Sequence, residues 1–119
     1  MSSEFELMRD HMRAQTGPFT PEEQLAAEMK LATLHADVFA LRLRAREGEN
    51  VPTLEEWGTH YRRKAPLLVR LSLSDPLRYE DMARDAVKQW REAEQREVTA
   101  IAAIGTGDDA ERWLANGGG

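Results

Sequence analysis

The chain has 119 residues, no cysteine and a formal net charge of −5 at pH 7. Its length predicts a single domain, and the lack of cysteine excludes disulfides, thiolate metal sites and cysteine nucleophiles. Because the chain is mildly acidic, it lacks the overall positive charge with which most nucleic-acid-binding proteins hold phosphate.

Residues 1–15, MSSEFELMRDHMRAQ, include no apolar block, so we expect neither a secretory signal nor an anchor. No apolar run approaches the length of a membrane span. We therefore expect a cytoplasmic protein, or a virion-associated one if a phage encodes it. The 16 basic residues are mostly arginine, a bias typical of GC-rich genomes, which favours a bacterial or phage origin.

Capping signals and apolar spacing predict five helices and no sheet, and hence an all-α protein. The first helix covers residues 4–15. The second covers residues 21–47, with Pro21 in its first turn and Gly48 after its last, where glycine commonly ends helices. At 1.5 Å per residue this second helix is about 40 Å long.

A third helix is predicted to begin at Leu54 and to be broken or restarted at Pro66. The segment 67–74, LLVRLSLS, alternates apolar and polar residues, as a strand does. Because a lone strand has no partner in this chain, we expect a short helix or an extended connector. Strand pairing between two chains remains the alternative.

The fourth predicted helix, 76–104, follows Asp75, and a short fifth helix covers 108–116 before a flexible glycine tail at 117–119. We expect one domain, residues 1–116. Its predicted base is an elongated antiparallel pair formed by helices 21–47 and 76–104, with the three shorter helices packed around them.

The helix at 21–47 has apolar residues on two opposite sides, because successive residues advance by about 100°. We call these sides the Leu25 stripe and the Leu31 stripe. The Leu25 stripe consists of Leu25, Met29, Ala32, Ala36, Phe39 and Leu43, and the Leu31 stripe of Ala27, Leu31, Leu34, Val38, Leu41 and Ala45. A helix with two apolar stripes is typically covered on both sides.

We expect helix 76–104 to cover one stripe. For the other, the prediction is a second copy or a larger protein partner; the shorter helices of the same chain remain the alternative cover. The predicted interface residues are Leu31, Leu34, Val38 and Leu41, together with Trp113 on the fifth helix, because tryptophan is enriched at interface hot spots.

Motifs for catalysis or cofactor binding are weak. Glu56 and His60 stand four residues apart, but no second motif accompanies them as in di-iron helical bundles, so we predict a surface pair and no metal site. Glu97 interrupts the apolar stripe of helix 76–104, which suggests that the helix leaves the core there, or that Glu97 contacts a partner. We therefore expect no enzyme activity and no cofactor.

Two basic clusters support an alternative function, regulation through nucleic-acid binding. Their residues are Arg42, Arg44, Arg46, Arg62, Arg63 and Lys64. Each cluster ends a predicted helix, where cations are favourable in any case. A second alternative is an enzyme or small-ligand binder with its pocket inside the bundle. The favoured prediction is a non-catalytic interaction or assembly subunit, either self-associating or docked on a larger complex.

Overall fold

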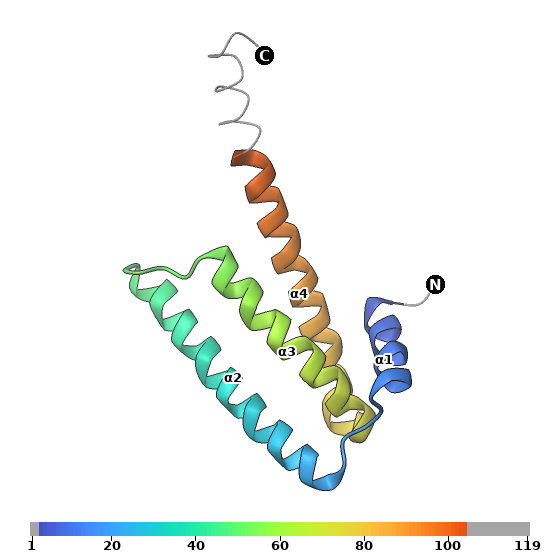
Figure 1. Ribbon diagram of the computed structural model, residues 1–119. Helices are drawn as coiled ribbons and strands as arrows, with labels where there is room; N and C mark the ends of the chain where they lie inside the picture. The colour runs from blue at the N-terminus through green and yellow to red at the C-terminus, as the bar shows by residue number, and fades with distance from the viewer. Residues whose placement is uncertain (1–2, 105–119) are drawn as a thin grey trace.

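The computed structural model describes residues 3–104, which form four helices and no strand (Figure 1). They are α1 (Glu4–Gln15), α2 (Pro21–Glu47), α3 (Leu54–Ser74) and α4 (Pro76–Ile104). The all-α prediction is confirmed, with four helices in this part of the chain. The predicted fifth helix and Trp113 lie outside the described residues.

The ends of α2 follow directly from local sequence. Thr20 Oγ1 accepts a hydrogen bond from the Glu23 backbone N–H at 3.3 Å, and the Glu23 carboxylate accepts one from the Thr20 N–H at 3.0 Å. This capping box satisfies two backbone donors that a helix start otherwise leaves unpaired. At the other end Gly48 has φ 76°, a left-handed conformation that favours glycine, and closes the last turn.

Residues 67–74 belong to α3, which continues through Pro66 as one helix of 21 residues. The prediction of a separate short helix or extended connector is therefore wrong. Leu68, Val69, Leu71 and Ser72 are all buried, so this end of α3 is enclosed on more than one side. Apolar residues all round a buried helix imitate strand alternation over a few residues.

Helix α3 is the central element. It packs against each of the other three helices, whereas α2 packs its backbone against α3 alone among the described helices. Figure 1 shows α2 and α4 running in the same direction with α3 antiparallel to both. The expected antiparallel pair of α2 and α4 is thus replaced by the hairpin of α3 and α4, which Asp75 joins. A 21-residue α3 is long enough, at about 31 Å, to pair with both long helices.

Small side chains bring α3 and α4 close together. Ala65 on α3 and Ala83 on α4 have no exposed surface, and Ala86 is almost as completely buried. Leu68 and Val69 fill the space around them and are themselves fully enclosed. The resulting molecule is thin, with extents of 62 × 39 × 21 Å.

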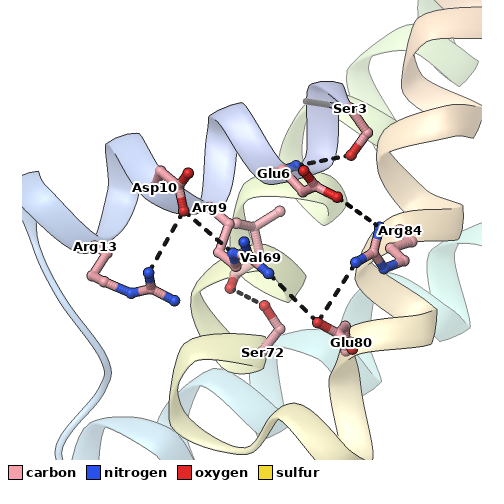
Figure 2. A network of polar contacts seen from close by, with 9 residues as sticks. All are labelled: Ser3, Glu6, Arg9, Asp10, Arg13, Val69, Ser72, Glu80 and Arg84. Atoms are coloured by element: carbon pink, nitrogen blue, oxygen red, sulfur yellow. Dashed lines mark hydrogen bonds and ion pairs between the residues drawn. The ribbon is translucent and has the colours of Figure 1, made fainter. Parts of the chain in front are cut away.

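Helix α1 covers the side where α3 and α4 meet, and packs there through a buried aromatic side chain. A chain of ion pairs also links α1 to α4 (Figure 2). Phe5 is buried, and the guanidinium groups of Arg9 and Arg84 lie 5.5 and 4.5 Å from its ring centre. Arg9 reaches Glu80 at 3.6 Å, and Arg84 reaches Glu6 at 3.9 Å. Because exposed ion pairs each contribute at most about 1 kcal/mol, the buried Phe5 ring carries most of the attachment.

Leu68→Ala tests this arrangement against Leu77→Ala. Leu68 is fully buried and Leu77 fully exposed, although both lie near the α3–α4 turn. We expect Leu68→Ala to lower the free energy of unfolding by about 2–5 kcal/mol, because it removes buried methyl groups and leaves a cavity. Leu77→Ala should change it by less than about 0.5 kcal/mol. Urea unfolding followed by circular dichroism measures both; equal losses would contradict the packing.

Candidate functional site

The structure separates the two stripes of α2 by burial. Leu31, Leu34 and Val38 are only 5%, 6% and 5% exposed, because this side of the helix packs against α3. Leu41, at the end of the same stripe, is half-buried. Leu31, Leu34 and Val38 are therefore core residues of the chain itself, which corrects the prediction that they form an interface.

The Leu25 stripe is the one that remains uncovered. Leu25, Met29, Phe39 and Leu43 are 63%, 66%, 69% and 45% exposed, and Ala32 and Ala36 between them are also exposed. Helix α4 does not cover this stripe as expected, because α3 lies between α2 and α4. Each large apolar side chain left in water forgoes about 1.5–3 kcal/mol of burial free energy. An apolar row of this length on one surface is typical of a contact site.

A short polar clasp holds the far end of α2 to α3. Arg44 lies 2.9 Å from the Glu56 carboxylate and also donates to the Asn50 carbonyl at 2.8 Å. The clasp links α2 to α3 while the Leu31 stripe faces α3, and as a partly exposed ion pair it contributes at most about 1 kcal/mol. Glu56 forms its ion pair with Arg44, and His60 is buried, so the predicted surface pair of Glu56 and His60 is wrong.

Leu34→Ala and Phe39→Ala test the assignment of the two stripes on one helix. We expect Leu34→Ala to lower the free energy of unfolding by about 2–3 kcal/mol, since it opens a cavity between α2 and α3. Phe39→Ala, measured in dilute protein, should change it by less than about 0.5 kcal/mol despite the larger truncation. The reverse order would mean that the Leu25 stripe is the buried one.

His60 on α3 is an unusual buried polar residue. It is 5% exposed, and neither ring nitrogen has a hydrogen-bond partner. Burial first, and then the nearby Lys64, lower the pKa of His60 to about 4, while Asp37 opposes the shift. The imidazole is therefore neutral at pH 7. No group of three or more candidate metal ligands lies together anywhere in residues 3–104.

A neutral buried histidine makes stability depend on pH. Because the unfolded chain takes up a proton on His60 near pH 6.5 and the folded chain only near pH 4, stability is full above pH 6.5 and falls as the pH drops to 4. We expect the native protein to lose roughly 3 kcal/mol more than His60→Gln over this interval. Chemical unfolding at several pH values measures the difference. The exposed His11 supplies the control: His11→Gln should keep the native pH dependence.

The basic clusters do not form one surface. Arg44 is engaged by Glu56, whereas Arg42 and Arg46 are exposed. Residues 62–64 point in three directions around α3, because neighbours on a helix differ by about 100°.

Within these clusters, burial lowers the pKa of Lys64, as does the nearby Arg42, whereas Asp85 raises it. Lys64 thus lies close to one arginine of the other cluster, with a carboxylate beside it. Arg62 and Arg63 are exposed but face elsewhere. Nucleic-acid binding therefore stays a prediction, and the two basic clusters do not combine into one basic surface that would support it.

Glu97 lies against Gly58. A Cβ atom on Gly58 would lie 3.0 Å from the Glu97 carboxylate. Because this buried glycine has no side chain, the carboxylate fits beside α3. Glu97 is half-buried at the level where α3 begins. Beyond it, Val98 and Ile101 are exposed, as expected for a helix leaving the core.

An open groove of about 920 Å³ runs between α2 and α3. Its walls are mainly apolar, with Phe19, Leu34 and Leu67 among them, and Arg70 closes one end. Arg70 is already engaged: its guanidinium stacks 4.1 Å from the Phe19 ring centre, and its Nε donates to the Gly17 carbonyl at 3.0 Å. The charged side chains of Lys30, Asp37 and Arg63 also line the groove.

Comparison with known proteins adds no functional information: no family model, no curated protein and no solved structure matches this chain. Within residues 3–104, no helix is both long enough and apolar enough to cross a membrane. The physical features of the surface are therefore the basis for a functional proposal.

Proposed function

We propose that the protein is a non-catalytic interaction subunit that binds another polypeptide through the Leu25 stripe of α2. This proposal rests on a row of large exposed apolar side chains on a helix capped at both ends: Leu25, Met29, Phe39 and Leu43. Protein contacts are commonly centred on large apolar side chains that become fully desolvated in the complex.

The construction of the molecule supports the same role. Helices α1, α3 and α4 form a core around Ala65, Leu68 and Val69, and α2 adds one face to it. The other face of α2 is then displayed on a rigid 27-residue helix. Binding through a preformed helix avoids the entropy cost of ordering a flexible segment on association.

Site-specific photo-crosslinking in the organism that encodes the chain tests this function. A benzophenone amino acid in place of Phe39 should give an adduct of discrete mass, because this side chain lies on the proposed contact. The same group in place of Arg96, which is exposed on α4, should give none. The adduct at position 39 should also disappear when Met29→Glu is introduced beside it, since a carboxylate buried at a contact is strongly unfavourable.

Absence of any adduct from position 39 would contradict an interaction through the Leu25 stripe. Adducts from both positions 39 and 96 would also contradict it, because they would indicate nonspecific encounters. Circular dichroism of each variant establishes that the fold is retained before the result is read.

A further inference from the structure

We propose that the partner of the Leu25 stripe is the same stripe of a second copy, with the two α2 helices antiparallel. This inference rests on the proposed function and names its partner. The two-fold axis passes level with residue 34, between Ala32 and Ala36 of the stripe. The dimer then consists of two thin helical layers joined edge to edge.

Side-chain size along the Leu25 stripe is symmetric about residue 34. Counting outward from residue 34 in both directions gives alanine and alanine, then methionine and phenylalanine, then leucine and leucine. An antiparallel two-fold places these residues opposite each other as the pairs Ala32–Ala36, Met29–Phe39 and Leu25–Leu43. A two-fold contact requires a surface that complements itself in this way.

The central alanines have a geometric role in such a pair. Two helices approach to about 8 Å only where small residues meet at the crossing point. Ala32 and Ala36 lie at the crossing point, and the larger Met29 and Phe39 lie on either side of it. These larger side chains can fill the space that opens as the two helices diverge.

The two ends of α2 carry opposite charges. Residues 21–29 of α2 carry three carboxylates, those of Glu22, Glu23 and Glu28, and no basic group. Residues 40–46 carry three guanidinium groups and no acid. Because Glu56 of the same chain holds Arg44, the exposed Arg42 and Arg46 supply the positive charge at this end, which Glu47 only partly offsets. Antiparallel pairing puts the acidic start of each helix beside the basic end of the other. Parallel pairing would gather the arginines of both copies at one end, which is repulsive.

The Leu25 stripe has enough exposed area for a contact between two copies, and its outer side is open to a second copy. The four large side chains of the stripe, about half to two-thirds exposed, and its two alanines offer roughly 500 Å² per copy. A symmetric pair would therefore bury on the order of 1,000 Å², which reaches the size expected of a specific contact. The opposite face of α2 packs on α3, so a second copy can approach from the outer edge without displacing a helix.

Sedimentation equilibrium across a dilution series tests the dimer. The native protein should show twice the 13.5 kDa mass of one chain and dissociate on dilution. The double variant Met29→Glu with Phe39→Glu should remain at the single-chain mass with unchanged helicity. Lys30→Glu is the matched control: it lies on α2 off the stripe and changes the net charge by the same −2, yet should leave the dimer intact.

Cysteine pairing tests the orientation, since the native chain has no cysteine. A mixture of Leu25→Cys chains and Leu43→Cys chains should form a disulfide-linked heterodimer on mild oxidation. Leu25→Cys alone should not, because an antiparallel pair separates the two copies of position 25 by about 27 Å along the helix. Efficient disulfide formation by Leu25→Cys alone would overturn the antiparallel arrangement.

The two proposals fail differently. A native protein that stays at the single-chain mass at every concentration overturns the dimer, and loss of the dimer in Lys30→Glu overturns its assignment to the stripe. If position 39 then still crosslinks in the cell, to an adduct whose mass is not twice that of the chain, the proposed function stands with a different partner. If position 39 does not crosslink at all, both fall.

Discussion

The burial of α3 on several sides is the constraint on which the rest of the structure depends. Ala65, Leu68, Val69 and Leu71 have no exposed surface, because α3 packs against all three other described helices. An apolar central helix must be enclosed by its neighbours, and the alanines on α3 and α4 allow the closest of these to approach. Removing that enclosure would leave α1, α2 and α4 without a common partner, since α2 and α4 each depend on α3 for their main contact.

The position of α2 at the edge of this arrangement creates the candidate interaction surface. A helix at an edge needs only one apolar side, yet α2 has two, and α3 covers only the Leu31 stripe. The Arg44–Glu56 pair links the two helices in this orientation. The same packing that stabilises the chain therefore leaves Met29 and Phe39 in water, where association with another polypeptide would bury them.

Some polar side chains attach one helix to another, whereas His60 is buried without a polar partner. The ion pairs of Arg9 and Arg84 surround Phe5 and orient α1 on the hairpin, whereas His60 is enclosed between helices without a hydrogen-bond partner and stays neutral. Burying the neutral imidazole of His60 costs little free energy, whereas burying the protonated imidazolium without a partner costs far more. Acidification therefore destabilises the packing around His60.

Local structure could be predicted from the sequence: the caps at Thr20 and Gly48, the bounds of α1, α2 and α4, and the two apolar stripes. These features depend on residues within a few positions of one another, so a single chain segment contains their cause. Three other features depend on packing between distant segments: residues 67–74 continue α3, α3 pairs with α4, and α3 covers the Leu31 stripe of α2. Both stripes have the same periodicity and similar apolar content, so periodicity cannot distinguish them. The choice depends on the residues of α3, which are far from α2 in sequence.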